Sequence, residues 1–248
     1  MKKIQDGYQN EFYFVIEFNN KKIKELNPLQ KELIEDLFPN FNENLIIKSW
    51  RNKNSYEKGD IFMKINNTIK TISIKKESRN SVHVERLDSL KKFLRELGIK
   101  NKVLEYYENF HYGIDKDNSN KVLSAKEYKA KYKTEIEIIN KNLLTINIEK
   151  IIDRFILSGK FAKNKVDAIV YGTPNDFLWI NKEDITKIIK SNLNNISNGI
   201  HISCLFIQPL NRCLNNNTKY LKYRDYIQVK WYSLFDDIIK YKNNKLKF

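Results

Sequence analysis

An aspartate, a serine and a lysine occupy matching positions of a short predicted β-hairpin. Two segments of alternating polarity flank Asn66 and Asn67, a residue type that tolerates the positive φ of a tight turn. If these asparagines form the turn, Asp60 pairs with Ser73, and Lys75 lies on the same face two residues further along. The hairpin therefore predicts a carboxylate and an ammonium group side by side on a rigid support.

This pair of groups suits the metal-assisted hydrolysis of a phosphodiester. Mg²⁺ prefers one or two carboxylates together with water and phosphate oxygens, so Asp60 is a candidate ligand. A bound metal polarises the phosphoryl oxygen and acidifies a water molecule, and a lysine stabilises the negative charge that develops. A second acid is expected nearby.

The elements that must position these groups follow from polarity patterns. The second face of the hairpin is apolar and predicts a core of Ile61, Met63, Ile65, Ile72 and Ile74. Strands are predicted at residues 12–18, 45–50, 60–75 (the hairpin), 167–171, 201–208 and 226–232. Helices are predicted at residues 28–38, 81–97, 103–110, 148–157 and 182–193.

The pattern is typical of an α/β protein with a mixed β-sheet core flanked by helices. Only 7 glycines and 4 prolines occur, and no flexible linker is visible, so one domain over residues 1–248 is expected. Within it we expect a catalytic hairpin and helix at 58–98, a helical insertion at about 101–158, and candidate DNA-recognition strands and a loop at 200–232.

The amino-acid composition indicates which kind of partner the protein binds and in which cell compartment it works. The net charge of +15 favours a polyanion, nucleic acid before a membrane surface, although the 38 lysines and 32 asparagines also match an AT-rich genome. Two cysteines and three histidines form no zinc spacing and no disulfide framework. No signal peptide, membrane span or Gly-rich phosphate loop is visible, so a cytoplasmic protein without NTPase activity is expected.

The hairpin resembles the PD-(D/E)xK nuclease superfamily, which includes most type II restriction endonucleases. Asp60 matches the first acid of that motif and Lys75 its lysine, whereas Gly59 replaces a common proline and Ser73 replaces the second acid. Some restriction enzymes carry Ser-x-Lys here and supply the glutamate from the following helix. By this resemblance Glu85, on the helix predicted from Ser81, completes the site.

The resemblance implies Asp60, Lys75 and Glu85 as catalytic residues, with Asp60, Glu85 and the Ile74 carbonyl as Mg²⁺ ligands. Other acids compete with Glu85 for the second position, namely Glu77 in the loop after the strand and Glu32 or Glu35 on the helix predicted at 28–38. His83 is expected either to contact the scissile phosphate or to have a packing or capping role. For Glu85 the alternative is a solvated acid at the start of a helix with no part in catalysis.

Base reading requires Arg, Asn, Gln or Lys side chains that reach a groove of the duplex. The candidates flank the site or lie in and beside the C-terminal loop, and they are Arg79, His83, Asn211, Arg212, Arg224, Gln228 and Lys230. Gln228 and Lys230 alternate with apolar residues, so they share one strand face. A solvated surface loop is the alternative.

The prediction is a Mg²⁺-dependent type II site-specific deoxyribonuclease that cuts double-stranded DNA. Two-fold symmetric targets imply a homodimer. The resemblance to restriction endonucleases also implies that a tetramer is an alternative assembly and that a cognate DNA methyltransferase is present in the same cell. The rival predictions are a structure-specific repair or mobile-element nuclease of the same fold and a basic nucleic-acid-binding protein without catalysis.

Overall fold

The structure is a computed structural model, and it describes residues 6–40, 42–54, 57–76, 80–118, 121–160, 164–193, 198–211 and 218–245. Two compact units account for the chain. The first consists of residues 1–80, 152–188 and 233–248, and the second of residues 81–151 and 189–232. The organisation of residues 1–248 as one domain stays a prediction.

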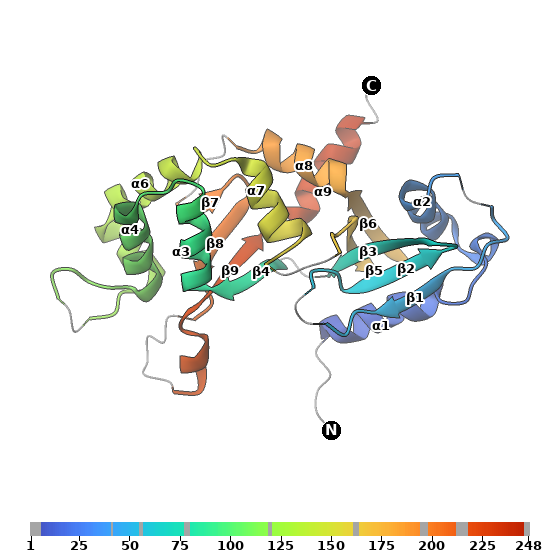
Figure 1. The fold of residues 1–248 in the computed structure, drawn as a ribbon, viewed down its shortest axis with the longest axis horizontal. Coiled ribbons are helices and arrows are strands. Elements are labelled where there is room, and N and C mark those ends of the chain that lie inside the picture. The colour runs from blue at the N-terminus through green and yellow to red at the C-terminus, as the bar shows by residue number, and fades with distance from the viewer. Residues whose placement is uncertain are drawn as a thin grey trace. The chain divides into compact units, whose positions relative to one another are not determined.

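A five-stranded mixed sheet forms the centre of the first unit (Figure 1). Its order is β1-β2-β3-β5-β6, in which β3 and β5 are parallel and the other neighbours are antiparallel. The strands are β1 (Lys48–Arg51), β2 (Ile61–Ile65), β3 (Thr68–Lys75), β5 (Ala168–Thr173) and β6 (Asp176–Asn181). The predicted α/β class with a mixed, helix-flanked sheet is confirmed.

The hairpin of β2 and β3 has the predicted register. Ile61 pairs with Ile72, and Ile65 pairs with Thr68 across the turn. Asn66 takes a φ of 51°, a conformation that asparagine adopts more readily than most residues. Because the turn and the alternation agree, the hairpin places Asp60 opposite Ser73, as the sequence predicts.

Helices α1 (Asp6–Phe18) and α2 (Pro28–Leu37) and the 3₁₀ turn η1 (Ile23–Glu25) pack against the apolar face of this sheet. The first unit also contains the π-helical turn η2 (Asp153–Leu157), helix α9 (Leu234–Lys245) and most of helix α8 (Lys182–Ser191). One buried cluster joins Phe14 and Phe18 of α1 and Leu33 of α2 to Met63 and Ile72 of the hairpin. Burial on this face leaves the opposite face of the hairpin for chemistry.

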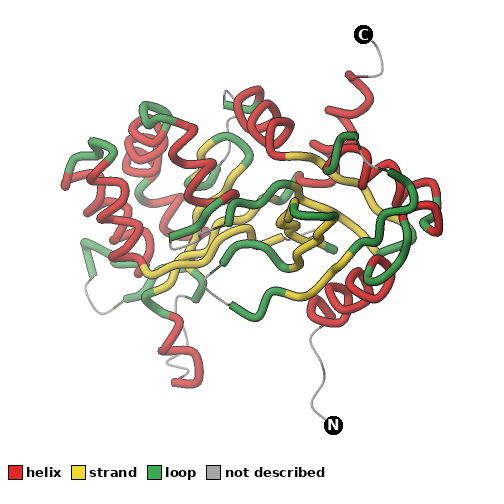
Figure 2. Tube along the Cα trace, turned by 45° about the vertical axis from the view of Figure 1, so that its right-hand side comes forward, coloured by secondary structure: helices red, strands yellow, loops and turns green. Residues whose placement is uncertain are grey.

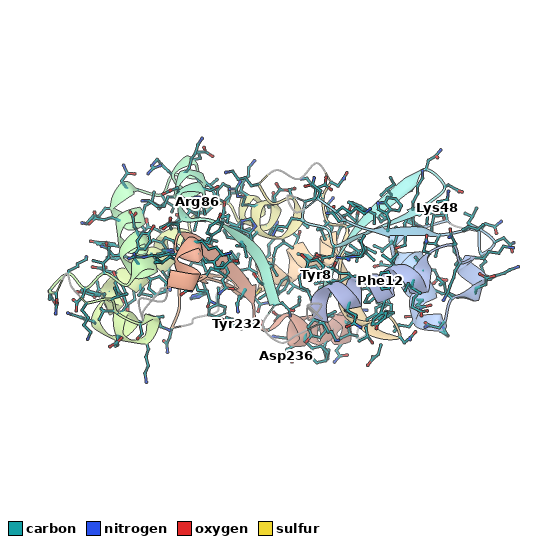
Figure 3. All side chains as sticks on the ribbon, turned by 90° about the horizontal axis from the view of Figure 1, so that it is seen from below. Tyr8, Phe12, Lys48, Arg86, Tyr232 and Asp236 are labelled. Atoms are coloured by element: carbon teal, nitrogen blue, oxygen red, sulfur yellow. The ribbon has the colours of Figure 1, made fainter. Side chains whose placement is uncertain are left out.

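Residues 12–18, predicted as a strand, belong to helix α1. Phe14 and Phe18 are fully buried, four residues apart, whereas Tyr8 and Phe12 are about half exposed on the outer side of α1 (Figure 3). Large apolar side chains therefore occur on both sides of the helix, and the 3.6-residue period is hidden in the sequence. Contacts with the sheet, and not local pattern, select the buried side.

The second unit contains a four-stranded sheet in the order β4-β9-β8-β7, with helices around it (Figure 2). Its strands are β4 (Asn80–Arg86), β7 (His201–Ile202), β8 (Leu205–Pro209) and β9 (Tyr226–Trp231). Its helices are α3 (Leu87–Glu96), α4 (Asn101–Tyr112), α5 (Ala125–Lys131), α6 (Lys133–Leu143), α7 (Ile148–Ile152) and the 3₁₀ helix η3 (Thr218–Tyr223). Much of residues 101–158 is helical, as predicted.

The helix predicted at 81–97 begins later than expected. Residues Asn80–Arg86 form strand β4, and α3 starts only at Leu87. From Val82 to Arg86 more exposed and buried side chains alternate, with His83 and Glu85 buried, and the strand lies beside β9. Pairing with a strand that is distant in sequence overrides the helical pattern, and only the end of the helix near Gly98 is as predicted.

Two strands differ from their predicted form. Residues 201–208 are predicted as one strand, but Ser203 takes a φ of 57° and separates β7 from β8, which pair with each other. Strand β6 has no counterpart in the sequence prediction. Among the described residues, none of the helices is long and apolar enough to cross a lipid bilayer.

Candidate active site

Asp60, Ser73 and Lys75 meet on one face of the β2–β3 hairpin. Asp60 Oδ2 accepts hydrogen bonds from Ser73 Oγ at 3.0 Å and from the Ile74 amide at 2.6 Å. Lys75 Nζ lies 3.3 Å from the same oxygen and donates to Ser73 Oγ at 2.8 Å and to the Ile74 carbonyl at 3.0 Å. The predicted carboxylate–ammonium pair therefore exists, with Ser73 between its members.

Strand pairing holds this cluster rigidly. The Asp60 amide donates to the Ile72 carbonyl at 2.8 Å, and the Asn52 amide donates to the Asp60 carbonyl at 2.9 Å. Side chains of Asp60 and Lys75 are 25% and 17% exposed, so both are partly shielded and still reachable from solvent. Partial shielding strengthens the field of these charges on a ligand without closing the site.

Gly59 occupies a place with no room for a side chain. A Cβ atom there would lie 2.1 Å from the Thr71 methyl carbon. The residue is next to Asp60, and its carbonyl accepts a hydrogen bond from Asn52 Nδ2 at 2.8 Å. Glycine thus lets the chain pass close to β3 and set the position of Asp60.

Gly59→Ala is expected to lower the free energy of unfolding by about 1–3 kcal/mol, because overpacking of a filled space displaces its neighbours. Thr71→Ser removes the obstructing methyl group, so the double variant Gly59→Ala/Thr71→Ser should recover most of the loss. Urea unfolding of wild type, both single variants and the double variant measures this. Equal stability of Gly59→Ala and wild type would contradict the close approach.

Glu11 of helix α1 is a second acid beside this cluster, and sequence analysis did not find it. Burial raises the pKa of Glu11, the Asp60 carboxylate raises it further, and Arg51 and Lys75 lower it. Glu11 Oε2 accepts two hydrogen bonds from Arg51, at 2.9 and 3.1 Å, and its side chain is 18% exposed. The charges of Asp60 and Lys75 act on Glu11, so the three belong to one electrostatic site.

The sequence pattern predicts a strand at residues 12–18, and Glu11, just before it, carries no signal of a site there. The acids considered on an N-terminal helix, Glu32 and Glu35, lie on α2 and are exposed. Predicting residues 6–18 as a helix would have made Glu11 a candidate acid on an N-terminal helix.

The donor set fits Mg²⁺ at a site that substrate and water complete. Lys75 Nζ contacts oxygens of Asp60, Ser73 and Ile74, so these atoms form a cluster that attracts a cation. Within the described part of the chain, no group of three or more His, Cys, Asp or Glu side chains is placed to hold a metal. One or two carboxylates with water and phosphate oxygens are the usual Mg²⁺ environment, and Asp60 and Glu11 are the carboxylates available for it here.

Glu85 lies on β4 in the second unit, and not on a helix. Its Oε1 is 3.0 Å from His83 Nε2, and both side chains are about 5% exposed or less. The two residues share a strand face because they are two positions apart. Glu85 as a metal ligand and His83 as a DNA contact therefore stay predictions, while their mutual pairing is a feature of the structure.

The other residues predicted to contact DNA lie in different parts of the chain. Arg79 and Arg212, like the competing acid Glu77, lie outside the described residues. Gln228 and Lys230 do share the less buried face of β9, opposite Gln208 and Phe206 of β8. The expected polar strand face is confirmed, and its use for DNA recognition stays a prediction.

Arg224 is tied into the second unit near the end of α4. Its carbonyl oxygen lies 2.7 Å from His111 Nε2, and its guanidinium carbon lies 5.4 Å from the centre of the Tyr112 ring. Asn211 follows β8, at the start of the loop predicted to be cationic. Neither position tests the predicted contact with bases.

Comparison with solved structures finds a likeness to a restriction endonuclease. The crystal structure of the restriction endonuclease MspI in complex with its cognate DNA is similar with a TM-score of 0.48 and 11% sequence identity, over 91% of this chain and 87% of that chain. No protein-family model matches the sequence. A search of curated proteins finds no match.

Proposed function

We propose that this protein is a Mg²⁺-dependent endonuclease that cuts double-stranded DNA at a specific sequence. The observation that carries the proposal is the Asp60–Ser73–Lys75 cluster on an open sheet face, with Glu11 in electrostatic reach. An acid, a lysine and a second acid are groups that metal-assisted phosphodiester hydrolysis can use. The net charge of +15 suits a polyanionic substrate.

Each side chain has a definite part in the proposed mechanism. Asp60 and Glu11 would hold Mg²⁺, with the Ile74 carbonyl as a further oxygen donor, and bound Mg²⁺ polarises the phosphoryl oxygen and acidifies water. Lys75 stabilises the charge that develops on the phosphate oxygens. Ser73 holds the Lys75 ammonium at 2.8 Å and so positions it against the Asp60 carboxylate.

The second carboxylate is the point at which the structure and the sequence prediction differ. Glu11 is in the same unit as Asp60, and its pKa responds to the charges of Asp60 and Lys75. Glu85 of the second unit is the residue that the family resemblance implies. We place Glu11 in the role because it belongs to the unit that carries Asp60 and because the Asp60 carboxylate is among the causes that raise its pKa.

We also propose an oligomeric state, a partner enzyme and a cell compartment for this protein. Cutting both strands of a two-fold symmetric target requires two active sites, so we propose a homodimer, or a tetramer of two such dimers. A cell that contains this activity needs its own targets protected, which is the part of a cognate DNA methyltransferase. Both proteins would act on DNA in the cytoplasm.

Incubation with a panel of plasmid and phage DNA tests this function. Discrete fragments in Mg²⁺ and intact DNA in EDTA are the expected result, because metal removal takes away the acidified water. A smear, or cutting only at junctions and flaps, would favour the structure-specific nuclease. Equal DNA binding in Mg²⁺ and EDTA without any cleavage would leave a binding protein and overturn the proposal.

A further inference from the structure

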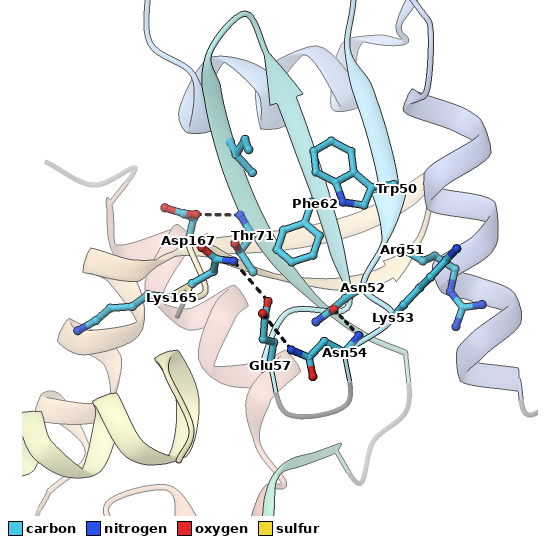
Figure 4. Close-up of a pocket in the computed structure, with 12 residues that line it drawn as sticks. Trp50, Arg51, Asn52, Lys53, Asn54, Glu57, Phe62, Thr71, Lys165 and Asp167 are labelled. Carbon is cyan, nitrogen blue, oxygen red and sulfur yellow. Dashed lines mark hydrogen bonds between the residues drawn. The ribbon is translucent and has the colours of Figure 1, made fainter. Parts of the chain in front are cut away.

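A pocket of about 810 Å³ opens on the sheet face that carries Asp60, Ser73 and Lys75, and it belongs wholly to the first unit. Trp50 of β1, Phe62 of β2, and Ile69 and Thr71 of β3 form its floor (Figure 4). Asparagine and lysine side chains of the loops before β2 and before β5 form its rim. An apolar floor with a polar rim is the usual construction of a site for a flat, partly polar molecule.

The floor presents an aromatic surface to solvent. Trp50 is 39% exposed, whereas Phe62 beside it is buried, and their ring centres are 5.6 Å apart at an angle of 31°. Ile69 is 49% exposed at the edge of the floor. Phe62 supports the Trp50 indole from the side, so the indole is held in place while part of it remains free to contact a ligand.

The pocket lies on the same sheet face as the Asp60–Ser73–Lys75 cluster, two residues further along β2 and β3. Phe62 is two residues from Asp60 along the chain, and Thr71 is two residues from Ser73 on β3, on the same face in each case. Two residues of a strand span about 7 Å. A group bound over Phe62 and Thr71 would therefore be a close neighbour of a phosphate held by Lys75.

Hydrogen bonds hold the asparagine side chains at the rim of the pocket. Asn52 Nδ2 donates to the Gly59 carbonyl at 2.8 Å, and Asn54 Nδ2 donates to Glu57 Oε1 at 3.2 Å. Asn164 Nδ2 donates to the other oxygen of Glu57 at 3.3 Å. Amide groups held in this way offer defined donors and acceptors to the edge of a ligand. Charges of both signs line the pocket, with Arg51, Lys53 and Lys165 beside Glu57 and Asp167.

We propose that this pocket binds one unstacked nucleobase of the strand that is cut, with the base lying against Trp50. Stacking on an aromatic ring is the interaction common to all bases, and the polar rim suits their edges. A base inside a duplex is not available to such a pocket, so it must be extruded or lie in a single-stranded or frayed region. The proposal rests on the proposed function and assigns a substrate contact beside its site.

Binding of single-stranded oligothymidylate in EDTA tests the pocket without cleavage. Dye-labelled oligothymidylate is titrated with wild type, Trp50→Phe, Trp50→Ala and Phe12→Ala, and fluorescence anisotropy gives the affinity. Loss of one stacked base predicts roughly 5- to 150-fold weaker binding for Trp50→Ala. Trp50→Phe should keep most of the affinity. Phe12→Ala, which removes a similarly exposed ring outside the pocket, should equal wild type.

Tryptophan emission of the wild type gives a second readout that needs no variant. Trp179 and Trp231 are buried, so a saturable change of emission with unlabelled oligothymidylate reports Trp50. Unchanged emission at saturation, or equal affinity of Trp50→Ala and wild type, would overturn the proposal. Dissociation of an oligomer in Trp50→Ala, with unchanged DNA affinity, would assign the surface to a second copy of the chain and would also overturn it.

The two proposals fail in different ways. Weaker binding by Trp50→Ala in a protein that never cuts DNA in Mg²⁺ would keep the base pocket and refute the nuclease. Mg²⁺-dependent cleavage by wild type, with oligothymidylate affinity independent of Trp50, would keep the nuclease and refute the pocket.

Discussion

Replacing Lys75 by alanine is expected to lower the rate of DNA cleavage by roughly a thousandfold, the effect of losing a preorganised group that stabilises charge in the transition state. Lys75 Nζ contacts Asp60, Ser73 and the Ile74 carbonyl, so its position is fixed before substrate binds. Removal also leaves Asp60 without its counter-ion, and metal affinity need not fall. The loss should therefore appear in the single-turnover rate at saturating Mg²⁺, measured on any DNA that the wild type cuts.

Lys70 of the same strand provides the matched control. It lies 3.4 Å from Asp167, five residues before Lys75, and its removal takes away the same charge from β3. Lys70→Ala should cut at close to the wild-type rate. Lys75→Arg should remain strongly impaired, because a planar guanidinium cannot reproduce the three contacts of a compact ammonium. Equal cutting by Lys75→Ala and wild type would show that the hairpin is not the active site.

Glu11→Gln is expected to lower cleavage by roughly a hundredfold or more at neutral pH, as the removal of a Mg²⁺ ligand would. Gln keeps the shape of the side chain and an oxygen that can accept from Arg51, so packing of α1 should be retained. Glu85→Gln, tested in parallel, should have the smaller effect. Full activity of Glu11→Gln with loss of activity in Glu85→Gln would return the second carboxylate to Glu85.

The pH dependence provides an independent check on Glu11. Burial and the Asp60 carboxylate raise the pKa of Glu11 above the ordinary value of 4.5. Because the ionised form is the one that binds a metal, wild-type cleavage should fall on acidification through a pKa above 4.5, and Glu11→Gln should lack that part of the profile.

Stability should change in the direction opposite to activity. A carboxyl group with a raised pKa in the folded state binds its proton more tightly there than in the unfolded chain, so the free energy of unfolding declines as pH rises through that interval. Glu11→Gln removes this penalty and should unfold at the same or a higher temperature than wild type at pH 7. A clear loss of thermal stability in Glu11→Gln would mean that the residue is structural.

Local signals in the sequence determined the part of the site that lies on one hairpin. The turn at Asn66 and the alternation of apolar residues sufficed for the register, and the register placed Asp60 beside Ser73 and Lys75. The start of α2 followed from Asn27 and Pro28 in the same way, since Asn27 caps the helix by accepting from the Gln30 amide. Such features depend on residues that are neighbours in the chain.

Only the tertiary structure decided what surrounds that hairpin. Helix α1 has apolar residues on both sides, so its contact with the sheet selects its buried side and brings Glu11 within electrostatic reach of Asp60. Strand β4 forms beside β9, which is distant in sequence, and this placed Glu85 on a strand beside His83. The Trp50 pocket likewise combines β1, β2, β3 and two loops. In each case the free energy of packing between distant segments outweighs local propensity. That packing energy depends on both segments together, so it cannot be predicted from either segment alone.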